Sequence, residues 1–377
     1  MYKQEISQFS LKDQLFNQKT ITFLAQQLSV IEGFNSGAFK QDILDRISEH
    51  NLKEVIREIA LLLKTYIPGE YPEQLKHLLC SLPAPLDPSL QDDDFGLFIH
   101  APHSRFVALF GTSRDDLDTS LEALREITKR FSAEFAIRTF LNLYPQETLS
   151  FLKSCAQSDN YHVRRLASEG TRPSLPWGEK IDIDHKKPLV ILEVLHSDPT
   201  RYVTRSVANH LNDIYKFDPE LVYSTLKSWK KKKKQDPKEL SWMIKHSLRT
   251  AIKRGDPKAY GLLEYKKPDV VITDFNTKSE VVKIGDTFEF NFCITSKSHD
   301  TQNLLINYTM NYQGKNGATS LKTFKIADTT LGPLEKKKFR KRHPMRMMST
   351  KTLYPGTHEI TVYVNGEEQL KTSFELI

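Results

Sequence analysis

The sequence predicts two domains of different class, an all-α solenoid over residues 1–268 followed by an all-β sandwich over residues 269–377. Three observations predict this order. Aspartate-proline pairs recur every 18 to 20 residues between apolar stretches of helical period, a longer repeat of about 40 residues lies over them, and the apolar period changes to two after Pro268. A chain of 377 residues is long enough for two or three domains, each with its own core.

The aspartate-proline pairs mark helix starts. An aspartate carboxylate accepts hydrogen bonds from the free amides of a first helical turn, and proline has no amide to leave unpaired there. Apolar residues follow the first three pairs at spacings of three and four, and Gly255 is expected just past the end of the third helix. The sequence therefore predicts helices that begin at Asp198-Pro199, Asp218-Pro219, Asp236-Pro237 and Asp256-Pro257.

A longer repeat aligns three of these segments. VRRLASE at 163–169, VTRSVAN at 203–209 and IKHSLRT at 244–250 follow one another at offsets of 40 and 41 residues. Two helices per ~40 residues is the period of HEAT and armadillo repeats, which stack into a curved solenoid with a concave surface. Helical spacing also occurs in the segments 121–131, 132–143 and 147–156 and, less regularly, over 1–65, whereas residues 83–102 are expected to form an irregular connection.

After Pro268, apolar and polar residues alternate. The segments 288–294, 304–312, 360–364 and 370–376 follow this pattern, and turn signals such as Asn365-Gly366 separate them. Short strands over such a length predict an immunoglobulin-like sandwich, although the Cys…Trp…Cys signature of antibody domains is missing.

Charge and composition exclude several classes of protein. The formal charge is +7, but residues 151–268 alone carry 24 basic and 14 acidic side chains, which makes the middle of the chain a candidate surface for an anionic ligand. No apolar run approaches the ~20 residues of a membrane span and the N-terminus lacks the apolar core of a signal peptide, so we expect a cytoplasmic protein. Three widely spaced cysteines predict reduced thiols, and no nucleotide or serine-hydrolase motif is present.

Charged residues recur at fixed positions of the repeat. Arg165, Arg205 and His246 align, and Glu169 and Asp213 lie further along the same helix faces. One interpretation is a basic concave groove that binds phosphates with carboxylates at its floor. The other is a set of solvated pairs at i,i+4, worth only ~0.2–0.5 kcal/mol each. A similar basic stripe on the third helix consists of Lys245, Arg249 and Lys253.

Two basic runs lie outside this pattern. Lysines 230–234 follow an apolar helix, where they either attract nucleic acid or simply end the helix in solvent. The run KKKFRKR at 336–342 lies in the β domain, where helix capping cannot explain it, so we favour contact with a polyanion.

Two further features are candidates for a ligand site or a metal site. The segment EGTRPSLPWG at 169–178 predicts a rigid turn, in which Trp177 either packs on a ligand or fills the gap between repeats. His100 and His103 could suggest a metal pair, but Pro102 spoils helical spacing and no third ligand is near, so no metal is expected.

Three segments together resemble a known family. SLEALREITKRFSAEFAIR at 120–138, VRRLASEGTRPSLPW at 163–177 and SVANHLND at 206–213 resemble the HEAT-like-repeat alkylpurine DNA glycosylases, specifically the AlkC branch of the DNA alkylation repair enzymes. The resemblance covers about residues 1–265. Some members of that branch also carry a C-terminal immunoglobulin-like domain.

The resemblance implies excision of N3-methylated bases, 3-methyladenine and 3-methylcytosine, from double-stranded alkylated DNA by a monomer without cofactor or metal, close to the nucleoid. Such a base is already cationic, so negative charge beside the sugar and a positioned water are what help. By the family pattern Glu134 and Asp213 match the carboxylates near the lesion, with Glu169 a third candidate, and Trp177 packs near the damaged nucleotide. The family is expected to act without extruding the base. The remaining expected DNA contacts are Arg165, Arg172, Arg205, His210, Lys245, His246, Arg249, Lys337 and Arg340.

A noncatalytic HEAT-repeat scaffold that binds nucleic acid or an acidic protein is the alternative from another functional class. Such a scaffold would have the same basic groove but would not catalyse a reaction.

Overall fold

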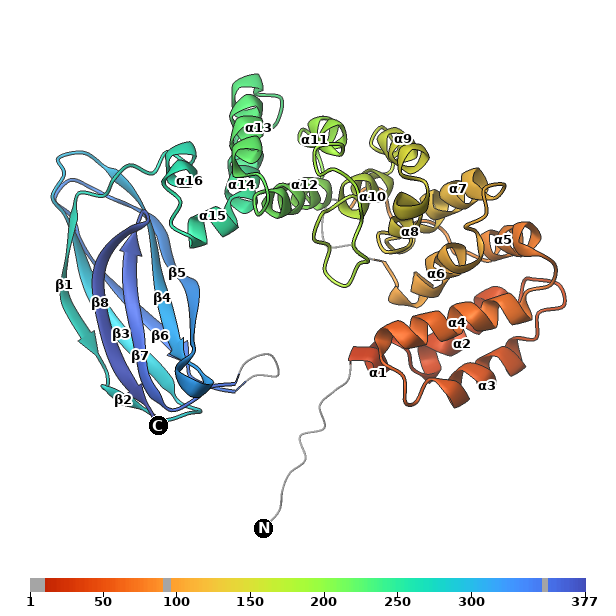
Figure 1. Ribbon diagram of the computed structural model, residues 1–377, viewed down its shortest axis with the longest axis horizontal. Coiled ribbons are helices and arrows are strands. Elements are labelled where there is room, and N and C mark those ends of the chain that lie inside the picture. The colour runs from red at the N-terminus through yellow and green to blue at the C-terminus, as the bar shows by residue number, and fades with distance from the viewer. Residues whose placement is uncertain (1–10, 91–95, 348–351) are drawn as a thin grey trace, which may run out of the picture. The chain divides into compact units, whose positions relative to one another are not determined.

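The computed structural model describes residues 11–90, 96–347 and 352–377 (Figure 1). Helices come first and strands follow, as the fold class predicted. By internal contacts the chain divides into two units, Met1–Asp218 with Trp229–Ser247, and Pro219–Ser228 with Leu248–Ile377. Residues 248–268, which the sequence assigns to the helical domain, therefore group with the strands.

The helices have the following bounds. They are α1 (Leu11–Leu15), α2 (Gln18–Leu28), α3 (Ser36–Arg46), α4 (Leu52–Tyr66), α5 (Tyr71–Cys80), the 3₁₀ turn η1 (Phe98–His100), α6 (Ala101–Phe110), α7 (Leu117–Ile127), α8 (Ala136–Leu143), α9 (Pro145–Cys155), α10 (Tyr161–Gly170), α11 (Leu189–Leu195), α12 (Arg201–Ile214), α13 (Pro219–Lys232), α14 (Pro237–Ser247), α15 (Arg249–Lys253) and α16 (Pro257–Leu262).

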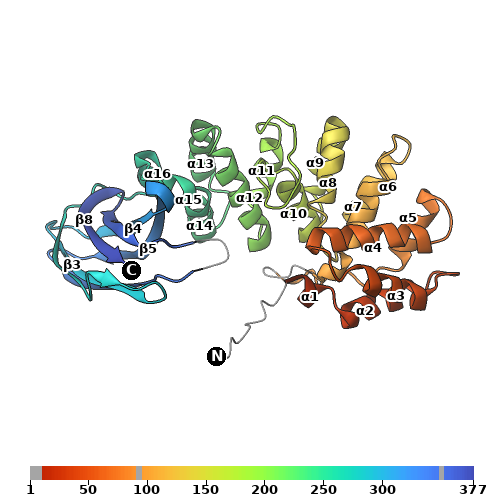
Figure 2. The same ribbon diagram turned by 60° about the horizontal axis from the view of Figure 1, so that its bottom comes forward.

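Within the first unit the helices form two rows. In one row α4 contacts α6, α6 contacts α8, α10 contacts α12 and α12 contacts α14, while in the other α5, α7, α9 and α11 contact each other in turn. Figure 2 shows these helices following one another in chain order. Fully buried leucines fill the space within and between the rows, and each is worth roughly 1.5–3 kcal/mol of burial; they include Leu124, Leu141, Leu166, Leu192 and Leu211.

Three of the four aspartate-proline pairs begin helices as predicted. α13, α14 and α16 each begin at the proline, and the Asp236 and Asp256 carboxylates accept bonds from amides of the first turn. The prediction for Asp198 is wrong, because α12 begins three residues later, at Arg201. Asp198 instead binds the Arg164 guanidinium, with Nε 2.5 Å from Oδ2 and Nη2 3.1 Å from Oδ1.

The predicted segments 121–131 and 132–143 form two helices that are shorter at their junction than expected. α7 ends at Ile127 and α8 begins at Ala136, and between them Phe131 forms an isolated bridge with Gly96. Gly96 has a φ of +75°, and a Cβ there would lie 1.9 Å from the Arg130 carbonyl oxygen, so no other residue fits this approach. The third predicted helix breaks at Leu248 and ends at Gly255, whose φ of +71° confirms its predicted place past the helix end. In the expected irregular connection, residues 91–95 lie outside the described part, and η1 and the start of α6 are helical.

The second unit contains two facing sheets, one with the strand order β1-β3-β6 and the other with β2-β8-β7-β4-β5. Phenylalanines from both sheets meet in the core; the rings of Phe288 and Phe374 stack 4.0 Å apart. The four predicted strands correspond to β3, β4, β7 and β8, and the other four lack clear alternation. The bounds are β1 (Val270–Thr277), β2 (Val281–Val282), β3 (Thr287–Ser296), β4 (Gln302–Gln313), β5 (Thr319–Leu331), β6 (Lys336–Pro344), β7 (Gly356–Val364) and β8 (Glu367–Leu376), with a 3₁₀ turn η2 (Lys315–Gly317).

All three cysteines are free, as predicted. Cys155 and Cys293 are buried, whereas Cys80 is exposed. Across the described residues, every helix is too short or too polar to span a membrane.

Candidate active site

The three predicted carboxylates lie in one continuous row of alternating charges. Arg165 joins the first two, since its Nη1 lies 2.6 Å from Glu134 Oε2 and its Nη2 lies 3.6 Å from Glu169 Oε1. Arg172 joins the second and third, with Nη1 2.6 Å from Glu169 Oε1 and Nε 3.0 Å from Asp213 Oδ2. We call these five residues the charge ladder. The sequence placed its members on three separate segments, and the fold brings them together.

Helix periodicity and the repeat position the ladder. Arg165 and Glu169 are four residues apart on α10, so they share a face, and Asp213 lies on α12, which packs directly on α10. Ser206 on α12 contacts Ser168 on α10 through a hydrogen bond of 2.9 Å between their hydroxyls. The two helices are therefore held in a register that aligns their charged faces.

Burial strengthens the electrostatic interactions of the charge ladder, because little water screens them. Side-chain exposure is 14% for Glu134, 5% for Glu169 and 3% for Asp213. Burial opposes ionisation of Glu169, but the attraction of Arg165 and Arg172 outweighs it and lowers the pKa of this carboxyl. The Lys216 ammonium also pairs with the ladder, 3.1 Å from Asp213 Oδ1, so three carboxylates face three cations and the ladder fixes local negative charge in a poorly solvated place without a net charge.

Two residues that sequence reasoning missed support the first arginine. The Ser132 hydroxyl donates to Glu134 Oε2 at 2.7 Å and accepts from Arg165 Nη1 at 2.9 Å. The buried ring of Tyr202 lies 4.5 Å from the guanidinium of Arg165 as a cation-π partner. Tyr202 carries no polar signal in the sequence, because it occupies an ordinary apolar position of α12.

Arg138 on α8 holds the turn that follows α10, and sequence reasoning missed this role. Its Nη1 donates to the carbonyl oxygens of Gly170 at 2.9 Å and Arg172 at 2.8 Å, and its Nε donates to that of Glu179 at 2.5 Å. Burial, with repulsion from Arg172, lowers the pKa of Arg138 to about 10. A lone arginine in the apolar stretch AIRTFLNL was the available signal.

The turn presents Trp177 to solvent. Its side chain is 60% exposed and its φ is +64°, a left-handed conformation that is costly for a bulky residue. The Lys53 ammonium on α4 donates to the Trp177 carbonyl oxygen at 2.8 Å and holds this conformation. The interpretation of Trp177 as a plug between repeats therefore fails, and the ring is available to a ligand.

The other predicted DNA contacts of the first unit differ in how deeply they are buried. His210 is fully buried, with Nδ1 3.0 Å from the Ser168 carbonyl oxygen and a pKa lowered to about 4 by burial, so it is not placed to contact DNA. His246 lies 2.9 Å from Asn209 Oδ1 and stacks on Trp242. Arg205 and Lys245 are half-buried on α12 and α14.

The predicted contacts of the second unit are Arg249 on α15 and the basic run on β6. β6 is an edge strand, where lysines also discourage pairing with other chains, so the run has a structural role that the sequence did not suggest. Lys337 turns toward β5 and donates to Thr329 Oγ1 at 3.0 Å. Arg340 is exposed and pairs with Glu289 on β3.

The two histidines near α6 make no metal centre. Their rings lie 5.1 Å apart and both are buried, and among the described residues no three potential ligands gather anywhere. Burial lowers the pKa of His100 to about 4 and that of His103 well below its ordinary value, so both rings are neutral at pH 7.

Comparisons with known proteins agree with this architecture. Residues 271–377 match the family described as "Uncharacterised protein YhaZ, C-terminal Ig-like domain". Uncharacterized protein YhaZ of Bacillus subtilis (strain 168) is 31% identical, over 96% of this chain and 98% of the relative. The solved structure of the Pseudomonas fluorescens alkylpurine DNA glycosylase AlkC, bound to DNA containing an abasic site analog, is similar with a TM-score of 0.87 and 32% identity, over 98% of this chain and 99% of that one. The chain therefore belongs to the AlkC family of alkylpurine DNA glycosylases, with an immunoglobulin-like domain at its C-terminal end.

Proposed function

We propose that this protein hydrolyses the N-glycosidic bond of N3-methylated bases, 3-methyladenine and 3-methylcytosine, in double-stranded alkylated DNA. The observation that carries the proposal is the charge ladder, which fixes three carboxylates in a poorly solvated site. The similar AlkC structure was solved with DNA containing an abasic site analog, and an abasic site is what base removal leaves behind.

The chemistry needs little beyond this charge. An N3-methylated base is cationic and leaves without prior protonation, so a general acid is unnecessary. As the bond breaks, positive charge moves onto the sugar, which becomes an oxocarbenium-like ion. A carboxylate fixed nearby in a medium of low dielectric stabilises that charge without reorganisation, and water then attacks the sugar carbon.

The ladder suggests separate roles for its carboxylates. Glu134 is the most exposed of the three and stands in the connection before α8, so we assign it the direct approach to the sugar or its attacking water. Glu169 and Asp213 are almost fully buried, and each binds Arg172. We assign them to the field of the site, where they also keep Arg172 and the turn behind Trp177 in place.

DNA binding is distributed over both units in this proposal. Arg165 and Arg205 of the first unit hold the backbone near the lesion, with Lys245 and His246 further along, and Trp177 packs beside the damaged nucleotide. We do not require that the base be extruded, because the negative charge acts on the sugar and not on the base. Arg249 and the outward face of β6, with Arg340, supply separate contacts from the second unit.

Base release from methylated duplex DNA tests the proposal. The purified chain should release 3-methyladenine and 3-methylcytosine in the presence of EDTA, and Asp213→Asn should lose release while still binding duplex DNA. Glu122→Gln is a matched control, because Glu122 is an exposed carboxylate on α7 that pairs with Arg125 and takes no part in the charge ladder. Normal duplex binding with no released base would instead favour the noncatalytic scaffold.

A further inference from the structure

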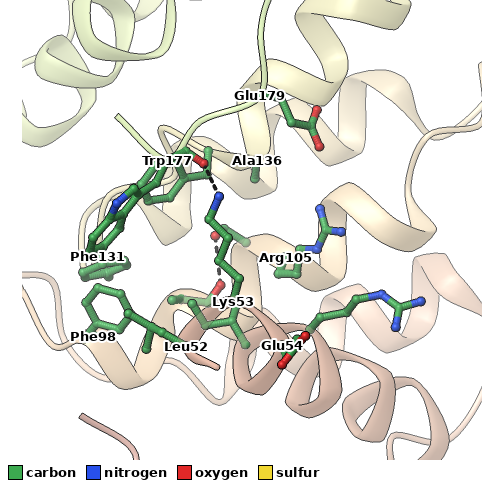
Figure 3. A pocket seen from close by; sticks show the side chains of 14 residues that line it. Leu52, Lys53, Glu54, Phe98, Arg105, Phe131, Ala136, Trp177 and Glu179 are labelled. Atoms are coloured by element: carbon green, nitrogen blue, oxygen red, sulfur yellow. Dashed lines mark hydrogen bonds between the residues drawn. The ribbon is translucent and has the colours of Figure 1, made fainter. Parts of the chain in front are cut away.

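A pocket of about 300 Å³ opens in the first unit between α4, α6, the start of α8 and the turn that carries Trp177 (Figure 3). This volume is at the lower end for sites that take small molecules, and it suits one planar ring system. Phe135 and Ala136 line the pocket and directly follow Glu134 in the chain, so its wall is continuous with the segment that carries the first carboxylate of the ladder.

Aromatic rings form one side of the pocket. Figure 3 shows Phe98, Phe131 and Trp177 gathered there, and the rings of Phe98 and Phe131 lie 4.7 Å apart. Lys53 extends across the pocket from α4, and its ammonium donates to the Trp177 carbonyl oxygen. The structure thus maintains a strained, exposed tryptophan over an apolar pocket, an arrangement on which a flat ring can stack.

The charges around the pocket select among possible rings. Lys53, Arg57 and Arg105 line it together with Glu54 and Glu179, which leaves one net positive charge. A cationic methylated base is therefore disfavoured in the pocket, whereas a neutral base with its anionic phosphate is favoured.

We propose that this pocket binds one neutral, unpaired nucleobase next to the damaged nucleotide. The base stacks on the aromatic side, and Arg105 approaches the phosphate that accompanies it. The inference rests on the proposed function for the location of the DNA, and it adds a second site, which prefers a neutral base. Two sources share this chemistry, namely the base opposite the lesion and a neighbour on the damaged strand.

Duplexes with 2-aminopurine test the pocket directly. The fluorescent base is placed opposite an abasic site analogue, beside that analogue, or in a fully paired duplex. In the wild-type chain, we expect tighter binding and a fluorescence change for one of the two positions at the abasic site, and the position that responds identifies the source. Phe98→Leu, which keeps an apolar side chain, and Arg105→Gln should each weaken binding of that duplex about tenfold, with binding of the paired duplex unchanged.

Matched controls come from residues outside the pocket. Phe110→Leu at the end of α6 and Arg114→Gln, which is exposed and paired with Glu147, should leave both affinities unchanged. Equal wild-type affinity for all three duplexes would overturn the inference, as would Phe98→Leu and Arg105→Gln variants that behave like these controls. Failure of the glycosylase proposal is separate, because Glu134→Gln should abolish base release and retain the 2-aminopurine response.

Discussion

Replacing Arg138 by methionine tests how the turn behind the charge ladder is held. The guanidinium bonds three backbone carbonyl oxygens of that turn, and two of them, in Gly170 and Arg172, belong to buried residues. Methionine fills much of the same volume but donates no hydrogen bond. The turn then loses the contacts that connect it to α8, and Arg172 and Trp177 lose their fixed places.

The two free-energy effects of this change oppose each other. A buried carbonyl left unpaired costs about 1–3 kcal/mol, so two cost about 2–6 kcal/mol. The pKa of Arg138, lowered from 12.5 to about 10, means that burial disfavours its charged form by about 3 kcal/mol, a cost that methionine removes. We therefore expect a net loss of at most about 3 kcal/mol in the free energy of unfolding. Displacement of Arg172 and Trp177 by about 1 Å should reduce base release about 100-fold.

Urea unfolding and single-turnover base release, measured on the same preparation, separate the two effects. Arg125→Met is the matched control, because Arg125 lies on α7 with its guanidinium 4.7 Å from the Phe151 ring, away from the turn. We expect Arg125→Met to release base at the wild-type rate. An Arg138→Met variant that is as active as this control would refute the role assigned to Arg138.

Three further predictions concern charge. Burial lowers the pKa values of His100 and His210 to about 4, so each neutral histidine contributes stability above pH 6.5 that is lost as the pH falls toward 4. The free energy of unfolding should therefore be about 2 kcal/mol lower per histidine at pH 5 than at pH 7. The His100→Phe variant should show a smaller difference between these two pH values. The lowered pKa of Glu169 keeps its carboxylate ionised, so pH profiles of single-turnover release should be flat between about pH 6 and 8; an acid limb centred near pH 7 would contradict this. In salt titrations of duplex binding, Arg340→Gln should reduce the slope by about one, whereas Lys337→Gln, which loses its bond to Thr329, should lower stability and leave the slope unchanged.

Local patterns predicted much of the fold. Asp236 and Asp256 begin helices because capping depends only on neighbouring residues, and Gly255 ends one for the same reason. Asp198 has the same local sequence but a stronger partner in Arg164, 34 residues away, and no local rule could reveal it. β6 escaped prediction because two of its inward positions hold Lys337 and Lys341, so the alternation of burial along the strand is not an alternation of apolar and polar residues.

The sequence predicted which residues belong to the site better than it predicted the contacts between them. The repeat placed Arg165, Glu169 and Asp213 on comparable faces, but the pairing of Arg172 with Asp213 spans 41 residues and depends on how α10 packs on α12. His210 was expected to contact DNA and is nevertheless buried, because its side chain points toward α10, where its ring contacts the Ser168 carbonyl oxygen. Arg138 carried a signal, an arginine in an apolar stretch, that became meaningful only once its carbonyl partners were known.

The central claim is that a fixed negative charge beside the sugar drives base release. The most direct measurement is the single-turnover rate of 3-methyladenine release from duplex DNA by Glu134→Gln, at enzyme concentrations that saturate binding. The substitution keeps the shape of the side chain and removes its charge. We predict a rate 100-fold or more below wild type with unchanged duplex affinity, in line with the loss of one preorganised electrostatic group. A wild-type rate in this variant would contradict the claim.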